Sequence, residues 1–350
     1  QMMAFPFRKI WVMNITMCWY GTYLLTTFYS LNVNILSQSA GNLRLKAVED
    51  TSETKCDGTY DLFWNTHKLL YNKKNNLDKN WLTWFMGFVE GDGAILNYNN
   101  QCRFVMTQRD INMLYEIQNK LGFGKIILYK KNNHIQYGRY MITSNKDCIL
   151  LYLLFNKNLC LNHRIYQLER WYPMLTQYTK NTQMTTEMDN LPCVYSMAKK
   201  VSLNDAWLSG FTDAEGCFSI TKYRNRDIIY IKSRFILDQQ DEFMLNTISL
   251  LLYDKQLAKT RKNHKNMKNN FRMEMSCNNK FKNQMLLNYF NKYNTRTSKY
   301  NSYLMFKSML TKIVDKQPLP KVEIQEMDKL RKEMNKYTMD NKPMGHKNKS

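Results

Sequence analysis

The sequence predicts an α+β protein that is built from two similar halves. An internal repeat recurs at a constant spacing of 131 residues, and a short glycine-containing helical motif precedes each copy. None of the 6 prolines falls within residues 85–172 or 208–314, so both stretches can form unbroken helices and strands.

The repeat is clearest between residues 103–121 and 234–252, and chance would give about one identity in such a window. Each copy is expected to end a strand and then begin a helix that Asp110 or Asp241 caps. Apolar residues follow at i, i+3 and i+7, which is typical of a helix with one buried face. The identical pairs are Arg103/Arg234, Phe104/Phe235, Gln108/Gln239, Asp110/Asp241, Met113/Met244, Leu114/Leu245, Ile117/Ile248 and Leu121/Leu252.

Prolines and polar stretches mark the expected domain boundaries. Pro173 and Pro192 bracket a polar linker, and Pro318 and Pro320 end the second half. We therefore expect an N-terminal extension (1–80) that is irregular or derived from exon or intron sequence, a first repeat (81–172), a linker (173–203), a second repeat (204–314), and a short basic helix with a charged tail (315–350).

Composition points to a polyanionic partner. The formal net charge is +22, for which a phosphate backbone is the usual counterpart, although a solvated basic surface or a membrane-facing patch is the alternative. The 8 Cys form no CxxC pair and the 5 His do not cluster with them, so we expect no zinc site and a reduced compartment. Residues 10–43 carry no charge, but polar residues interrupt them, and no stable membrane span is expected.

Codon bias indicates the origin of the chain. With 23 Met and 23 Tyr but only 12 Gly, the composition favours A/T-rich codons and a code with an extra Met codon, as in a mitochondrial genome. The chain begins with Gln1, so we expect processing from a longer translation product.

Two nine-residue motifs carry the chemistry: residues 85–93 (FMGFVEGDG) and 208–216 (LSGFTDAEG). Each has small residues four apart, which lie on one helix face and let two helix backbones approach closely; they are Gly87, Gly91, Gly210 and Ala214. Helices packed in this way would bring Asp92 and Glu215 together at their ends. Two neighbouring carboxylates repel each other unless a cation lies between them. Oxygen ligands suit Mg²⁺, which can activate water and stabilise the leaving oxygen of a phosphodiester.

These motifs, together with the repeated strand–Gln–Asp–helix pattern, resemble the LAGLIDADG family in its monomeric two-motif form over residues 81–313. The resemblance implies two pseudo-symmetric αββαββα repeats whose saddle-shaped antiparallel sheets form a groove for nucleic acid. It also implies that Asp92 and Glu215 are the metal-binding catalytic acids, with Gln108 and Gln239 beside the metal and its waters.

The sequence departs from the family pattern at three places. Met86 occupies a position that is usually small, so the helix interface is expected to widen or the side chain to bend aside. Glu215 replaces the commoner Asp. The family often has a Lys near the scissile phosphate on a later strand, but residues 139–143 and 271–276 offer none, leaving Lys146 and Lys280 as late candidates.

Basic residues concentrate on the predicted hairpins of both halves, where alternate side chains can face a groove. A solvated basic edge is the alternative. The expected nucleic-acid-binding residues are Arg103, Lys125, Lys130, Lys131, Arg139, Lys222, Arg224, Arg226, Lys232, Arg234, Lys259, Arg261, Lys262 and Arg272.

The resemblance leaves two functions open, and we favour the first. One is an RNA maturase that binds its own group I intron and assists splicing in the mitochondrial matrix, with a nuclear-encoded helper protein as a further partner. The other is a monomeric, Mg²⁺-dependent homing endonuclease that cuts double-stranded target DNA; one protein can do both. A membrane-associated structural protein is a third, less favoured reading of residues 11–28.

Overall fold

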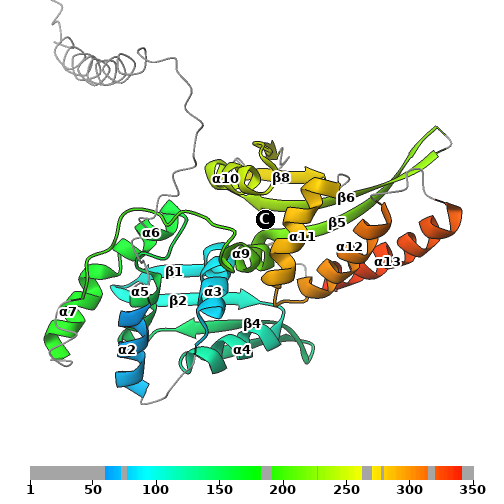
Figure 1. Ribbon diagram of the computed structural model, residues 1–350. Helices are drawn as coiled ribbons and strands as arrows, with labels where there is room; N and C mark the ends of the chain where they lie inside the picture. The colour runs from blue at the N-terminus through cyan, green and yellow to red at the C-terminus, as the bar shows by residue number, and fades with distance from the viewer. Residues whose placement is uncertain are drawn as a thin grey trace, which may run out of the picture. The chain divides into compact units, whose positions relative to one another are not determined.

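The computed structural model describes residues 60–71, 77–182, 191–226, 228–261, 270–276, 280–313 and 320–340. Both repeats follow the expected αββαββα order, which confirms the α+β fold (Figure 1). The first repeat comprises α3 (Lys79–Asp92), β1 (Gly93–Tyr98), β2 (Gln101–Gln108), α4 (Ile111–Leu121), β3 (Lys125–Lys131), β4 (His134–Ile142) and α5 (Asn145–Phe155). The second comprises α9 (Trp207–Glu215), β5 (Gly216–Asn225), β6 (Ile228–Gln239), α10 (Glu242–Tyr253), β7 (Ala258–Arg261), β8 (Asn270–Ser276) and α11 (Lys280–Lys292).

Further helices flank the repeats. They are α2 (Asp61–Tyr71) before the first repeat, α6 (Asn162–Glu169) and α7 (Tyr172–Thr182) after it, and α12 (Lys299–Ile313) and α13 (Lys321–Asp340) after the second.

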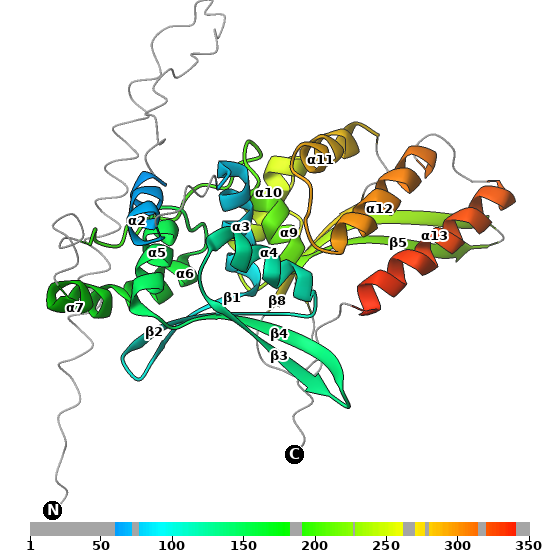
Figure 2. The same cartoon turned by 90° about the horizontal axis from the view of Figure 1, so that it is seen from below.

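Each repeat contains one four-stranded antiparallel sheet, ordered β1-β2-β4-β3 in the first and β5-β6-β8-β7 in the second. Helices cover one face of the first sheet (Figure 2). On β2, Phe104 and Met106 are buried beneath those helices, whereas Arg103 alternates with them and points to the opposite, open face. The alternation therefore gives each repeat an apolar face for its core and an open face lined with polar side chains.

The repeated aspartates begin the helices that follow the second strand of each repeat. Asp110 Oδ1 accepts a hydrogen bond from the amide of Met113 at 3.3 Å, and Asp241 Oδ1 accepts one from Met244 at 2.9 Å. Each carboxylate satisfies one of the amides that the first turn of a helix leaves without a partner.

The helices α3 and α9 pack together along their small residues. A Cβ built on Gly87 would lie 1.9 Å from the carbonyl oxygen of Trp207, and one on Gly210 would lie 1.8 Å from that of Trp84. The interface is therefore not widened beside Met86, whose side chain is buried in the apolar core. Backbone-to-backbone contact of this kind tolerates only glycine.

One expectation about the flanking segments is wrong. Residues 61–71 lie in the extension that we expected to be irregular, yet they form α2, which packs against α5 and buries Phe63 and His67 on one face. His67 Nε2 also lies 2.7 Å from the carbonyl oxygen of Leu121. The polar linker is partly helical, because α7 continues to Thr182. Residues 10–43 lie outside the described residues.

The C-terminal helix differs from the expected short basic one. Helix α13 spans 20 residues, and its 5 basic residues are balanced by 5 acidic ones. One of these acids, Asp328, forms an ion pair of 3.6 Å with Lys222 of β5, so the helix packs on the long hairpin of the second repeat.

Candidate active site and nucleic-acid interface

The two motif acids lie at the adjacent ends of α3 and α9. Asp92 is the last residue of α3, and Glu215 is the last residue of α9. A Cβ built on Gly91 would lie 2.2 Å from Cβ of Ala214 and 3.1 Å from Cγ of Glu215, so the last turns of the two helices are in contact. The structure thus brings together the two carboxylates that the sequence singled out.

Both helices stop at a glycine. Gly93 and Gly216 have extended backbones with φ of −79° and −90°, rather than the left-handed conformation typical of a helix cap. A side chain is excluded sterically instead, because a Cβ would lie 2.6 Å from the Val89 oxygen at Gly93 and 2.5 Å from Thr212 Cγ2 at Gly216.

The acid pair is electrostatically strained. Desolvation, followed by the charge of Asp92, raises the pKa of Glu215 to about 7. Desolvation also raises the pKa of Asp92, even though solvent reaches its carboxyl group. Two crowded carboxylates that resist ionisation form a place where a bound cation would be stabilising.

The two glutamines beside the acids are not equivalent. Gln108 Nε2 donates a hydrogen bond of 2.6 Å to Asp92 Oδ2. Gln239 Oε1 instead accepts a hydrogen bond of 2.7 Å from the amide of its neighbour Gln240. Only the first half therefore has the glutamine bound to its motif acid.

Two cations at the helix ends were missed from the sequence. Arg164, near the start of α6, donates from Nε and Nη2 to the Glu90 carbonyl oxygen at 3.0 and 2.9 Å, at the end of α3. Lys299, which begins α12, donates to the carbonyl oxygens of Thr212, Asp213 and Ala214 at 3.1, 2.7 and 3.0 Å, at the end of α9. A cation is stabilised near the C-terminal end of a helix, where the helix dipole is negative.

These cations also act on the acid pair, because Lys299 and Arg164 both lower the pKa values of Asp92 and Glu215 against the larger effect of desolvation. The family resemblance led us to expect a lysine on the later strands, whereas both cations lie in the first turn of a helix. Lys146 donates to the Leu70 carbonyl oxygen at the end of α2 at 3.1 Å. The side chain of Lys280 lies outside the described residues. The sequence signal that was available is a basic residue in the first turn of the second helix after each sheet.

A second acid in each motif is fully buried and was also missed. Glu90 accepts hydrogen bonds from the amides of Cys160 and Leu161 at 2.7 and 2.6 Å, just before α6. Asp213 accepts them from the amides of Arg296 and Thr297 at 2.7 and 3.2 Å, just before α12. Each acid thereby fixes the segment that carries the cation of its own half.

Two tryptophans join these buried acids across the helix interface. Trp207 Nε1 donates to Glu90 Oε2 at 2.6 Å, and Trp84 Nε1 donates to Asp213 Oδ2 at 2.8 Å. Each tryptophan directly precedes one motif and contacts the acid of the other. Burial raises the pKa of Glu90 to about 7 against these hydrogen bonds, so the carboxylate depends on every donor that it has.

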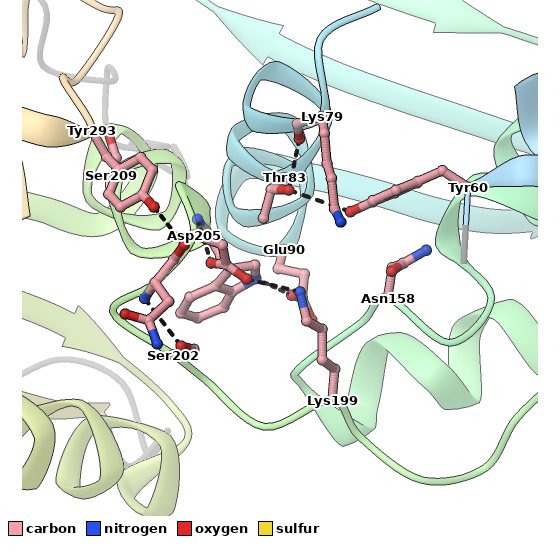
Figure 3. A network of polar contacts seen from close by, with 12 residues as sticks. Tyr60, Lys79, Thr83, Glu90, Asn158, Lys199, Ser202, Asp205, Ser209 and Tyr293 are labelled. Carbon is pink, nitrogen blue, oxygen red and sulfur yellow. Dashed lines mark hydrogen bonds and ion pairs between the residues drawn. The ribbon is translucent and has the colours of Figure 1, made fainter. Parts of the chain in front are cut away.

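The linker segment before α9 belongs to the same polar network (Figure 3). Lys199 forms an ion pair of 2.9 Å with Asp205, and Asp205 Oδ1 accepts from the amide of Trp207 at 3.0 Å. On the first-repeat side, Tyr60 and Thr83 form a buried hydroxyl pair. The network fixes the start of α9, and with it the position of Trp207 against α3.

The donor groups of this site suit a divalent cation that is bound by the protein and the substrate together. Among the described residues no group of three His, Cys, Asp or Glu side chains is placed to hold a metal ion. Asp92 and Glu215 offer carboxylate oxygens at the adjacent ends of α3 and α9. Mg²⁺ is commonly held by one or two carboxylates together with water and substrate phosphate, so the donor set fits Mg²⁺ bound between protein and a phosphodiester.

The open face of the first sheet is basic and aromatic. Arg103, Lys125, Lys131 and Arg139 lie on this face, and strands β1–β4 contain no Asp or Glu. Lys130 follows a register shift after Tyr129 and is exposed near the hairpin turn. All five predicted basic residues of this half are therefore accessible to a nucleic acid.

The second sheet differs in where its basic residues lie. The open face carries Lys232, Arg234, Lys259 and Arg272. Lys222 was predicted to bind nucleic acid, but the alternation of β5 places it on the opposite face, where it points to α13. Arg224 is exposed two residues further along the same strand, and Arg226 lies in the turn with φ of 54°. The side chain of Arg261 and the whole of Lys262 lie outside the described residues.

Comparison with known proteins identifies the family. The family model described as LAGLIDADG endonuclease matches residues 85–175 and 208–310, one match for each repeat. The chain belongs to the LAGLIDADG family, in its two-motif form, as the resemblance indicated.

Two of the curated relatives are named for introns. The chain is 30% identical over 248 residues to a probable intron-encoded endonuclease 4 of Neurospora crassa, covering 69% of this chain but 42% of that protein. It is 26% identical over 291 residues to an uncharacterized cox1 intron-2 37.2 kDa protein of Schizosaccharomyces pombe, covering 82% and 81%. An uncharacterized mitochondrial protein RF1 of Saccharomyces cerevisiae is 28% identical over 175 residues, covering 44% and 36%.

Solved structures share the fold. The LAGLIDADG meganuclease I-CpaMI bound to uncleaved DNA superimposes with a TM-score of 0.55 at 17% identity, covering 73% of this chain and 99% of that one. I-SmaMI bound to cleaved DNA gives 0.58 at 16% identity, covering 73% and 97%. Within the described part of the chain, no helix is both long enough and apolar enough to cross a membrane.

Proposed function

We propose that the protein is a site-specific homing endonuclease that hydrolyses both strands of a DNA target with Mg²⁺. The observation that carries this proposal is the meeting of Asp92 and Glu215 at the ends of two helices in contact. A scaffold that only bound nucleic acid would gain nothing from two desolvated carboxylates, one of which raises the pKa of the other, in a basic protein.

The chain's own residues would divide the work as follows. Asp92 and Glu215 would hold Mg²⁺, which supplies activation of water and charge stabilisation at the phosphodiester. Gln108 orients Asp92 through its hydrogen bond. Arg164 and Lys299 reduce the negative charge at the helix ends, and the open faces of both sheets would bind the DNA backbone and base edges on either side.

The maturase function stays a second prediction. One reason for preferring it was the lack of a lysine near the scissile phosphate on a later strand, and β4 and β8 indeed contain none. Lys299 and Arg164 place positive charge near the acids from helices instead, which supports the endonuclease. The basic open faces suit folded RNA as well as DNA, because RNA is recognised largely by shape and backbone. Binding to the group I intron, a nuclear-encoded splicing helper, a monomeric state and a place in the mitochondrial matrix belong to this proposal.

A single pair of assays tests both functions. Purified protein is incubated with a DNA duplex that spans the joined exons or with a duplex interrupted by the intron, each with Mg²⁺ or with chelator. It is also incubated with the host intron precursor RNA under splicing conditions. We expect Mg²⁺-dependent cleavage of the joined-exon duplex and none of the intron-containing duplex. Uncut duplex together with protein-dependent splicing would replace the endonuclease by the maturase.

A further inference from the structure

Two arginines occupy equivalent positions in the two sheets but have different neighbours. Arg139 of β4 pairs across the strands with Thr107, and Arg272 of β8 pairs with Asp238. Thr107 and Asp238 are themselves equivalent, because they are separated by the repeat spacing of 131. The chain therefore contains its own matched comparison between an arginine opposite a hydroxyl and an arginine opposite a carboxylate.

Arg272 is bound to its cross-strand neighbour. Its Nε donates to Asp238 Oδ1 at 2.7 Å and its Nη2 donates to Asp238 Oδ2 at 2.8 Å. This bidentate pair fixes the guanidinium plane and offsets its charge. Both N–H groups of Nη1 and one of Nη2 remain for another acceptor.

The second acid of this sheet has the same effect on its neighbours. Glu274 Oε1 accepts from Arg234 Nη1 at 3.1 Å and from Lys232 Nζ at 3.4 Å. Burial works to raise the pKa of Glu274, but these two ion pairs outweigh it and lower the pKa. Asp238 and Glu274 are the only acidic residues in strands β5–β8, and both bind arginine on the open face.

The first sheet shows the opposite arrangement. The Arg139 guanidinium lies 5.1 Å from the ring centre of Tyr129 and 5.9 Å from that of Tyr137, and these two rings stack at 4.6 Å. Arg103 lies 5.2 Å from the ring of Tyr98. Within the described ranges neither arginine forms an ion pair, so their charges face the open side without a carboxylate to offset them.

We propose that the two halves bind the DNA duplex in different ways: the first sheet anchors phosphates through Arg103 and Arg139, and the second sheet recognises sequence through Arg272, which Asp238 orients toward a guanine. The proposal rests on the proposed binding of duplex DNA. A guanidinium whose charge is offset gives little phosphate neutralisation, but a fixed one can donate two parallel hydrogen bonds to guanine O6 and N7. Asp238 is a positioning residue in this arrangement.

The experiment compares Arg139→Gln with the double variant of Arg272→Gln and Asp238→Asn, using Arg139→Lys and Asp238→Asn alone as controls. Affinity is measured from 50 to 300 mM KCl for a joined-exon duplex and for a scrambled duplex of the same length. Target preference is measured by sequencing the duplexes that each variant selects from a randomised pool. Thermal unfolding verifies that each variant is folded.

We expect Arg139→Gln to reduce the slope of log affinity against log salt by about 0.9 on both duplexes, as loss of one phosphate contact requires. Arg139→Lys should keep the slope, because it keeps the charge. Arg272→Gln is combined with Asp238→Asn, because the single variant leaves the Asp238 carboxylate unpaired. The double variant should leave the slope and the affinity for scrambled DNA unchanged, yet weaken joined-exon binding by about 5- to 100-fold and remove a guanine preference at one position. Asp238→Asn alone should make log affinity fall more steeply with log salt, and it should weaken the guanine preference at the same position of the target.

Equal slope changes for Arg139→Gln and the double variant, with no change in the selected sequences, would overturn the division between the halves. If the wild-type protein binds the joined-exon duplex but does not cut it, the proposed endonuclease activity is wrong while this inference on binding stands. Variant effects that occur on folded intron RNA but not on either duplex would overturn it, since the open faces would then take RNA.

Discussion

The contact between the two motif helices can be tested by moving one methyl group across it. Gly91 and Ala214 occupy the same position in their motifs, and a Cβ on Gly91 would lie 2.2 Å from that of Ala214. Carbon atoms in contact prefer about 3.5–4.0 Å. Gly91→Ala therefore forces the last turns apart by roughly 1.5 Å, and with them Asp92 and Glu215.

Overpacking in a dense interface costs about 1–3 kcal/mol, whereas alanine gains at most about 1 kcal/mol over glycine in a helix. We expect Gly91→Ala to lower the free energy of unfolding by about 1–2 kcal/mol. The double variant Gly91→Ala with Ala214→Gly restores one methyl per contact, so it should recover to within about 1 kcal/mol of wild type.

Urea unfolding followed by circular dichroism measures all four proteins of the cycle. Gly87→Ala supplies a contrasting case, because its Cβ would meet the backbone oxygen of Trp207 at 1.9 Å and no side-chain change can relieve it. A double variant no more stable than Gly91→Ala, or a fully stable Gly91→Ala, would refute the helix contact as we describe it.

Three further predictions follow from the buried groups and the charge. Trp207→Phe removes one donor to the buried Glu90 and should destabilise the fold by about 1–3 kcal/mol in thermal unfolding; an unchanged melting temperature would contradict the network. The pKa of Glu215 is raised from 4.5 to about 7, so ionisation destabilises the fold above that pH and not below 4.5. Glu215→Gln should therefore be more stable than wild type by about 1–3 kcal/mol at pH 8, but equal at pH 4; the reverse order would refute the strained acid pair. Finally, 6–10 phosphate contacts predict a loss of roughly 10³–10⁵ in DNA affinity between 50 and 200 mM salt, which filter binding would show and a flat response would exclude.

The sequence predicted the parts of the fold that local pattern determines. The repeat spacing located both sheets, Asp110 and Asp241 located the helix starts, and the small residues four apart located the helix contact. The capping and small-residue signals lie within about twenty residues of chain, where periodicity and capping chemistry can be recognised directly. The repeat was found by comparing two such short windows with each other.

Long-range partners were out of reach for the same reason. Arg164 and Glu90 are 74 positions apart, and Lys299 and Asp213 are 86 apart. Neither local pattern indicates that the two members of each pair meet. The family resemblance led us to expect a cation on a strand rather than at the start of a helix. The buried acids were passed over because each precedes the more conspicuous terminal acid of its motif by two residues.

The sequence predicted where basic residues occur on the strands but not which groups they contact. Strand alternation places a basic residue on one face or the other, but the partner of that residue depends on the neighbouring strand. Lys222 faces α13, and Arg272 is paired with Asp238, although both looked like phosphate ligands in the sequence. Helix α2 was missed because its buried face contacts a helix more than seventy residues away.

The central claim is that Asp92 and Glu215 together form the site of phosphodiester hydrolysis. Asp92→Asn and Glu215→Gln keep the shape of each side chain and remove the charge that would hold Mg²⁺. The decisive measurement is cleavage of the joined-exon duplex by wild type and by each variant in Mg²⁺, with binding of the same duplex measured in parallel. The account predicts that either substitution abolishes cleavage while binding persists, and cleavage that survives in both variants would contradict it.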